Sequence, residues 1–154
     1  MDKENTLYID LKDGRVVIQM RPDLAPKHVA QIKKLAREGK YDGVVFHRVI
    51  DGFMAQTGDP TGTGSGGMGE TLKSEFSKEP HVRGAVSMAR TSDPHSARSQ
   101  FFICFKDSNF LDGQYTVWGM VTSGMEHVDK IKKGEPPSNP DKMIKVQVAA
   151  DAKD

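Results

Sequence analysis

The stretch FHRVIDGFMAQTGD, residues 46–59, places two short extended runs on either side of an Asp51-Gly52 turn. An Asp-Gly dipeptide between apolar runs is typical of a β-hairpin. In such a hairpin Arg48 and Gln56 lie on one face of neighbouring strands. The stretch therefore predicts a cation and an amide held together beside the large apolar side chains of the turn.

A second run, SQFFIC at residues 99–104, repeats the combination of an amide with an aromatic ring. Gln100 and Phe102 are two residues apart, so they share one face of a strand. An exposed arginine is ordinarily one half of a surface ion pair. The amide and aromatic residues near Arg48 instead favour its placement in a binding site. A fixed cation over an apolar pocket suits a mostly apolar ligand with one polar atom, such as an Xaa-Pro peptide.

Length and charge limit the class of protein. The chain has 154 residues, which is enough for one domain with a full core. Its 22 basic and 21 acidic residues give a net charge of +1, which indicates neither nucleic acid nor a membrane surface as partner. The N-terminus lacks an apolar signal region, and no run approaches the roughly 18 apolar residues that span a bilayer. Cys104 is the single cysteine, so no intrachain disulfide can form, and we expect a cytoplasmic protein.

Alternating apolar residues and turn residues predict about eight strands and two helices. A hairpin is expected over residues 7–20, and Pro26 opens an amphipathic helix that ends at Gly39. A shorter helix follows Met125 and ends at Gly134. Further strands are expected at residues 44–50, 53–57, 85–88, 100–104, 116–121 and 143–149. Because many strands are neighbours in sequence and no βαβ series appears, the expected fold is a mainly β, closed eight-stranded antiparallel barrel capped by two helices.

Other stretches resemble known functional motifs but lack the neighbouring structure or partner residues that those functions require. The glycine-rich residues 64–69 match G-x-G-x-x-G without a buried strand before them or a helix after them, so a surface loop near a ligand groove is expected. The five histidines form no ligand pair at helical spacing, so we expect no metal. No G-x-S-x-G elbow is present, and Cys104 lies among apolar residues, so no nucleophile is indicated. His47 points away from Arg48 and is expected to be structural.

In the runs at residues 46–59 and 99–104 the chain resembles the cyclophilins, a family of peptidyl-prolyl cis-trans isomerases. The resemblance covers about residues 6–149 in the expected order, and the short loops and the run MART at residues 88–91 are similar to bacterial members. The matching motifs are FHRVIDGFMAQTGD (46–59), GAVSMAR (84–90), SQFFI (99–103), FLDG (110–113) and VWGMV (117–121). Three or more separated motifs are a far more specific signal than any one of them.

The resemblance implies a single isomerase domain over residues 1–154, with a groove on the outer face of the barrel. It assigns catalysis, without a metal or other cofactor, to Arg48, Gln56, Phe53 and Phe102. It assigns substrate binding to Met54, Ala89, Arg90, Gln100, Leu111, Phe110 and Tyr115. The expected partners are proline-containing peptides and folding proteins, and the expected state is a monomer.

Three positions depart from the common family pattern. Phe110 stands where many members carry tryptophan, whose indole N–H bonds the drug cyclosporin, and phenylalanine has no such donor. Tyr115 stands where many carry histidine, and Arg90 replaces a common asparagine. We therefore expect weakened cyclosporin binding with isomerase activity kept.

Two other classes of function remain open from the sequence. A non-catalytic module could bind proline peptides in the same groove, and an isomerisation assay separates the two. An unrelated β-barrel carrier would need an apolar interior with room for a ligand, whereas the many apolar residues indicate a filled interior.

Overall fold

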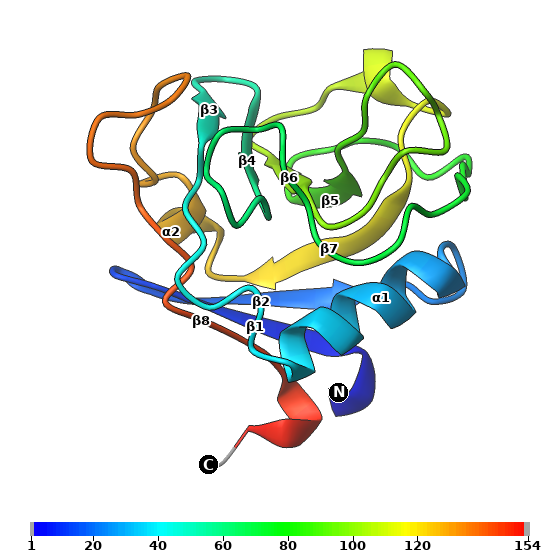
Figure 1. Ribbon diagram of the computed structural model, residues 1–154, viewed down its shortest axis with the longest axis horizontal. Helices are drawn as coiled ribbons and strands as arrows, with labels where there is room; N and C mark the ends of the chain where they lie inside the picture. The colour runs from blue at the N-terminus through cyan, green and yellow to red at the C-terminus, as the bar shows by residue number, and fades with distance from the viewer. Residues whose placement is uncertain (1, 153–154) are drawn as a thin grey trace.

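The structure is a computed structural model that describes residues 2–152, and its main feature is one eight-stranded antiparallel sheet (Figure 1). The strand order is β3-β4-β6-β5-β7-β2-β1-β8. The strands are β1 (Thr6–Leu11), β2 (Gly14–Met20), β3 (Arg48–Ile50), β4 (Met54–Thr57), β5 (Ala85–Met88), β6 (Phe101–Cys104), β7 (Val117–Ser123) and β8 (Lys145–Val148). The helices are α1 (Pro26–Arg37) and α2 (Met125–Val128), with 3-10 turns at Lys3–Asn5, Asn109–Leu111 and Ala149–Asp151. The predicted mainly β architecture with two helices is confirmed.

The sheet curves into a half-barrel that stays open, so the predicted closed barrel is wrong. Strands β3 and β8 are its two edges, and no ladder joins them within residues 2–152. The chain segments beside these edges are joined by the isolated bridges Val45–Lys142 and Val49–Gly134 and by irregular backbone hydrogen bonds to residues 141–143, which form no ladder. Three prolines lie in the intervening residues 136–140, and proline has no amide hydrogen to continue a ladder.

The first hairpin and the first helix form where the sequence predicts them. Leu11 pairs with Gly14 across a two-residue turn, and α1 buries one apolar face and contacts β8. The helix begins at Pro26 without a capping side chain of its own. Glu75 supplies the cap from a distant loop, because its carboxylate accepts hydrogen bonds from the backbone N–H groups of Lys27 (3.1 Å) and His28 (3.0 Å).

Two predicted elements are shorter than expected. The strand predicted over residues 44–50 is regular only at Arg48–Ile50, because the chain before it bonds irregularly to residues 141–143. The helix predicted to reach Gly134 ends at Val128, after which the backbone continues in i→i+3 turns. None of the helices in residues 2–152 has the length and apolar character that crossing a membrane requires.

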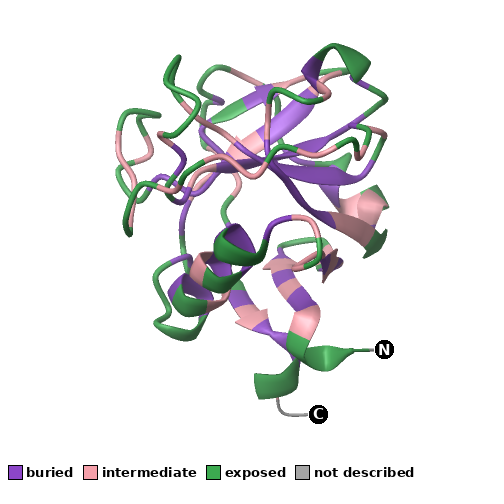
Figure 2. Cartoon of the chain, turned by 90° about the vertical axis from the view of Figure 1, so that its right-hand side faces the viewer, coloured by how far each residue is buried: buried purple, intermediate pink, exposed green. Residues whose placement is uncertain are grey.

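Two apolar clusters lie on the sheet, and Figure 2 shows its central strands as mostly buried. All four residues of β6 are buried. Phe101 and Ile103 belong to the interior core, whereas Phe102 and Cys104 belong to a smaller cluster on the outer face. The ring of Phe101 meets Tyr41 and Trp118 edge-on inside the half-barrel. This filled interior contradicts the reading as a ligand carrier, and the outer cluster forms the base of a surface site.

Candidate active site

A row of three side chains crosses the outer face of the sheet. Arg48 on β3 is in register with Gln56 on β4, and Gln56 is in register with Phe102 on β6. Arg48 Nη1 donates to Gln56 Oε1 at 3.3 Å. The predicted hairpin and the shared face of Arg48 and Gln56 are confirmed, and His47 is buried.

A pocket of about 130 Å³ opens beside this row. Its walls combine two arginines and one amide side chain with aromatic and aliphatic surface, a combination suited to a small apolar ring that carries a polar bond. Nine of the eleven predicted site residues line it: Arg48, Phe53, Met54, Gln56, Ala89, Arg90, Phe102, Leu111 and Tyr115.

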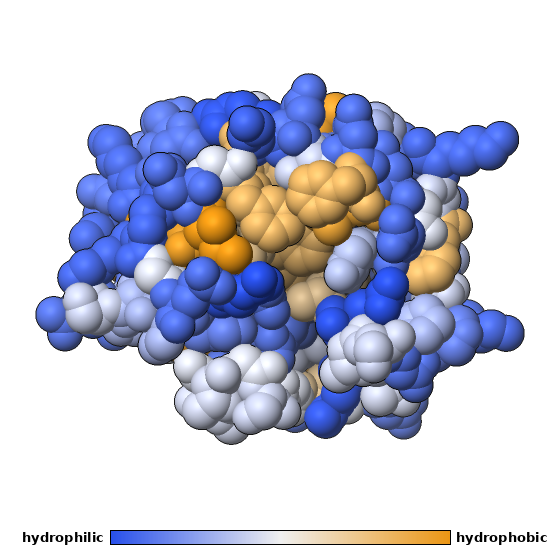
Figure 3. Space-filling view, turned by 90° about the horizontal axis from the view of Figure 1, so that it is seen from above, coloured by the Kyte–Doolittle hydropathy of each residue, from blue (hydrophilic) through white to orange (hydrophobic). Residues whose placement is uncertain are grey.

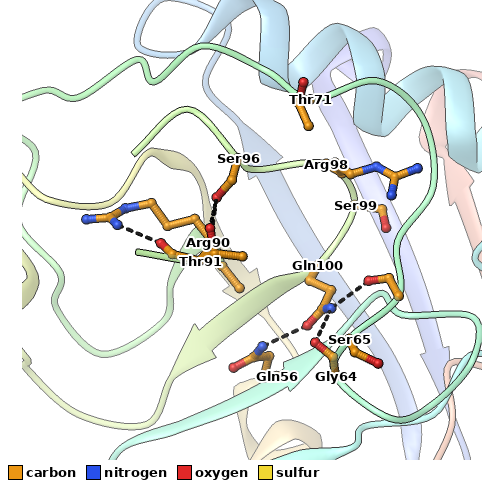
Figure 4. Close-up of a pocket in the computed structure, with 12 residues that line it drawn as sticks. Gln56, Gly64, Ser65, Thr71, Arg90, Thr91, Ser96, Arg98, Ser99 and Gln100 are labelled. Atoms are coloured by element: carbon orange, nitrogen blue, oxygen red, sulfur yellow. Dashed lines mark hydrogen bonds between the residues drawn. The ribbon is translucent and has the colours of Figure 1, made fainter. Parts of the chain in front are cut away.

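The other two predicted residues lie next to this pocket. Phe110 is 67% exposed at its rim, and its ring centroid is 5.5 Å from that of Phe53. Figure 3 shows apolar side chains gathered on this upper face inside a ring of hydrophilic ones. Gln100 lines an adjoining hollow of about 480 Å³, which shares Gln56, Ala89 and Arg90 with the smaller pocket (Figure 4).

Aromatic packing holds the wall formed by Phe102. The ring of Tyr115 meets it edge-on at a centroid distance of 5.8 Å. Arg90 in turn places its guanidinium 4.6 Å from the Tyr115 ring centroid and donates two hydrogen bonds to the Gln114 carbonyl. Arg90 therefore stabilises this side of the pocket through Tyr115.

A chain of three polar groups behind Phe102, two of them buried, is not predicted by any sequence pattern. His81 stacks on Phe102, and its Nδ1 lies 3.0 Å from Asp112 while its Nε2 lies 2.9 Å from the Ser87 hydroxyl. Burial lowers the pKa of His81 despite the hydrogen bond to Asp112, so the ring is neutral at pH 7. The order acid–histidine–serine resembles a hydrolase triad, but Ser87 has no exposed surface and cannot meet a substrate. No local motif links these three positions.

Asp59 organises the glycine-rich loop that borders the site. Its buried carboxylate accepts hydrogen bonds from the backbone N–H groups of Thr61 (2.9 Å), Gly64 (2.7 Å) and Gly66 (3.0 Å). Burial by itself raises the pKa of Asp59, but these bonds and that from the Thr61 hydroxyl outweigh it and hold the pKa well below its usual range.

Glu135 is a second residue near the site that no sequence motif indicates. Its carboxylate accepts a hydrogen bond from Arg48 Nε at 3.3 Å, and both side chains are about half exposed, Arg48 by 45% and Glu135 by 57%. An exposed pair of this kind contributes little to stability. Its effect is to orient one edge of the Arg48 guanidinium.

The site offers no reactive sulfur. Cys104 is buried under the outer cluster, and burial raises the pKa of its thiol to about 12. Within residues 2–152 no three His, Cys, Asp or Glu side chains gather as metal ligands would.

Comparisons with known proteins show the family of the chain. The model of the family "Cyclophilin type peptidyl-prolyl cis-trans isomerase/CLD" matches residues 6–149. A probable peptidyl-prolyl cis-trans isomerase of Brucella suis is 58% identical, with 99% of this chain and 86% of the relative covered. Peptidyl-prolyl cis-trans isomerase B of Bacillus subtilis is 45% identical, with 84% and 92% covered.

Solved structures show the same fold. Cyclophilin AquaCyp293 from Hirschia baltica superposes with a TM-score of 0.91 at 32% identity, covering 99% of this chain and 77% of the other. A cyclophilin type isomerase of Cryptosporidium parvum, solved in the presence of the dipeptide Ala-Pro, gives 0.86 at 27% identity, with 93% and 98% covered. The chain belongs to the cyclophilin family, and it is a peptidyl-prolyl cis-trans isomerase.

Proposed function

We propose that the 130 Å³ pocket receives the proline ring of the substrate and that Arg48 is the catalytic donor. The observation that carries this proposal is the convergence of Arg48, Gln56 and an apolar wall on one small pocket. The Cryptosporidium isomerase was solved in the presence of the dipeptide Ala-Pro, which supports a proline-containing peptide as the substrate.

The chemistry of the reaction explains why a donor is enough. Rotation about a peptide bond has a barrier of ~18–20 kcal/mol, which comes from resonance between nitrogen and carbonyl. In the twisted state that resonance is lost, and the proline nitrogen gains a usable lone pair. A donor aimed at that lone pair stabilises the transition state more than the planar ground state. No covalent bond is broken, so the reaction needs no nucleophile, metal or cofactor.

The pocket walls strengthen this interaction. Phe53, Met54, Phe102 and Leu111 would surround the proline ring and exclude water from the half-exposed Arg48 guanidinium. A hydrogen bond to a charged donor is stronger where water is absent. A rate gain of about 10⁵ corresponds to roughly 7 kcal/mol of differential stabilisation, which one donor and an ordered pocket would share.

The remaining groups of the site would hold the rest of the peptide. Gln56 lies within hydrogen-bond distance of Arg48 and would bond the carbonyl side of the substrate. The backbone near Ala89 and Arg90 borders both hollows, which suits an extended segment before the proline.

Replacing Phe102 with alanine tests the pocket assignment. The variant should bind an Xaa-Pro peptide at least tenfold more weakly. A tenfold loss of affinity corresponds to about 1.4 kcal/mol, which is less than the usual cost of removing a buried aromatic ring. Peptide affinity is measured by calorimetry on protein whose fold is checked by circular dichroism. The Phe102→Leu variant, which keeps an apolar wall, should lose less. Unchanged affinity in a folded Phe102→Ala variant would contradict the pocket.

Cyclosporin affinity should respond to the rim residue Phe110. The exposed phenylalanine ring has no hydrogen-bond donor, so we expect weak inhibition by cyclosporin. The Phe110→Trp variant gains an indole N–H and should be inhibited about fivefold to tenfold more strongly, as one hydrogen bond of ~1 kcal/mol predicts. Inhibition constants from the isomerase assay measure this. Equal inhibition of both proteins would show that Phe110 does not determine drug binding.

We propose that the chain assists protein folding, which is the general role of its family. A single buried cysteine fits a reducing compartment, which supports a cytoplasmic location. We propose that the chain works as one monomeric domain, without nucleic acid or membrane as partner, in line with its balanced charge of +1.

A further inference from the structure

A continuous line of hydrogen bonds runs from the glycine-rich loop to Arg48. The carbonyl oxygens of Gly64 and Gly66 accept from Gln100 Nε2 at 2.9 and 2.8 Å. Gln100 Oε1 accepts from Gln56 Nε2 at 2.9 Å, and Gln56 Oε1 accepts from Arg48 Nη1 at 3.3 Å. Figure 4 shows the two glutamines pointing toward each other beside the loop that carries Gly64.

The two ends of this line force the direction of every bond in it. A backbone carbonyl can only accept, and a guanidinium can only donate. If the Gln100 amide were reversed, its oxygen would face two carbonyl oxygens. If the Gln56 amide were reversed, its NH₂ group would face the N–H groups of Arg48. The loop carbonyls therefore determine which atom Gln56 presents to Arg48.

The loop carbonyls are themselves held in place. Gly64 and Gly66, whose carbonyls bind Gln100, are the residues whose N–H groups donate to the buried carboxylate of Asp59. A Cβ atom on Gly66 would lie 2.4 Å from Asp59 Oδ1, so this position requires glycine. A Cβ atom on the neighbouring Gly67 would approach nothing closer than 3.5 Å.

The guanidinium of Arg48 is restrained on two of its three nitrogens. Glu135 holds Nε and Gln56 holds Nη1, while Nη2 has no hydrogen-bond partner among residues 2–152. Nη2 keeps both of its N–H groups and Nη1 keeps one, so Nη2 is the least restrained of these donors for a substrate.

We propose that Gln100 is a positioning residue, which orients Arg48 through Gln56 under the control of the Asp59-anchored loop. The inference rests on the proposed catalytic role of Arg48 and differs from a substrate contact by Gln100. It makes the turnover number, and not peptide affinity, the quantity that depends on Gln100 and on Gly66.

The first test replaces Gln100 with glutamate, which keeps the size and the acceptor for Gln56 but loses the donor to the loop. We expect kcat for an Xaa-Pro peptide to fall about tenfold, a modest loss for a misaligned group, with KM changed less than twofold. In the Arg48→Ala background the same change should lower kcat no further. A rise in KM with unchanged kcat, or losses that multiply in the double variant, would overturn the inference and show that Gln100 acts on the substrate itself.

A second pair of variants probes the loop without touching either glutamine. Gly66→Ala should lower kcat about as much as Gln100→Glu, because its Cβ displaces Asp59 and the carbonyls that bind Gln100. Gly67→Ala is the matched control and should keep wild-type kcat. Thermal midpoints report whether each variant is folded at the assay temperature. Equal kcat for both alanine variants would contradict the loop's role, whereas full activity of Arg48→Ala alone would instead refute the proposed function.

Discussion

Replacing Arg48 with alanine should lower kcat/KM for an Xaa-Pro peptide about 100- to 1,000-fold, the loss expected if Arg48 is the preorganised transition-state donor that we propose. The fold should be unaffected, because the Arg48 side chain is 45% exposed and its ion pair with Glu135 lies at the surface. Protease-coupled turnover of a proline peptide measures the effect, with unfolding by urea as the check on stability.

Two further variants show whether the geometry of the guanidinium or its charge is responsible. Arg48→Lys keeps the charge but lacks the planar set of donors, so it should also be at least tenfold slower. Arg37→Ala is the matched control, since Arg37 is likewise exposed and paired with acids but lies on α1, away from the pocket. Near-normal turnover by Arg48→Ala or Arg48→Lys would remove Arg48 from the mechanism.

Replacing Asp59 with asparagine should lower the free energy of unfolding by about 3 kcal/mol, because buried N–H donors lose a charged acceptor. Asp59 has no exposed surface and bonds three backbone N–H groups in the loop. The loss should also lower turnover, since the same loop carries the carbonyls that hold Gln100. Urea unfolding curves of the two proteins at pH 7 measure the stability difference.

The stability effect of Asp59 should depend on pH. The pKa of Asp59 in the folded protein lies well below its usual value of 3.8, so its stabilising effect is complete above about pH 4 and declines as the pH falls further. The difference between wild type and Asp59→Asn should therefore shrink between about pH 4 and pH 2. As a matched control at pH 7, Asp51→Asn, at an exposed turn position, should leave the free energy of unfolding almost unchanged. A gap between wild type and Asp59→Asn that stays constant down to pH 2 would contradict the assignment.

Local patterns in the sequence are enough for most of the elements. The hairpins around Gly14 and Gly52 form as predicted because turn residues and alternation act over a few neighbouring residues. The facing of Arg48 and Gln56 follows from the register of one such hairpin. The resemblance to cyclophilins also named the eleven site residues, nine of which meet at one pocket.

Closure of the barrel could not be predicted in the same way. It depends on whether β3 and β8, nearly a hundred residues apart in the chain, find continuous hydrogen bonds. The prolines of residues 136–140 interrupt the segment that would supply them.

The sequence by itself determined the fold class, the hairpin that carries Arg48 and Gln56, and the family. Only the tertiary structure decided that Glu135 restrains Arg48, that His81 stands behind Phe102, and that Asp59 holds the loop facing Gln100. The physical reason is distance along the chain. Periodicity and turn chemistry act between near neighbours, whereas the partner of a buried or charged group is chosen by whichever distant segment the fold brings into hydrogen-bond range.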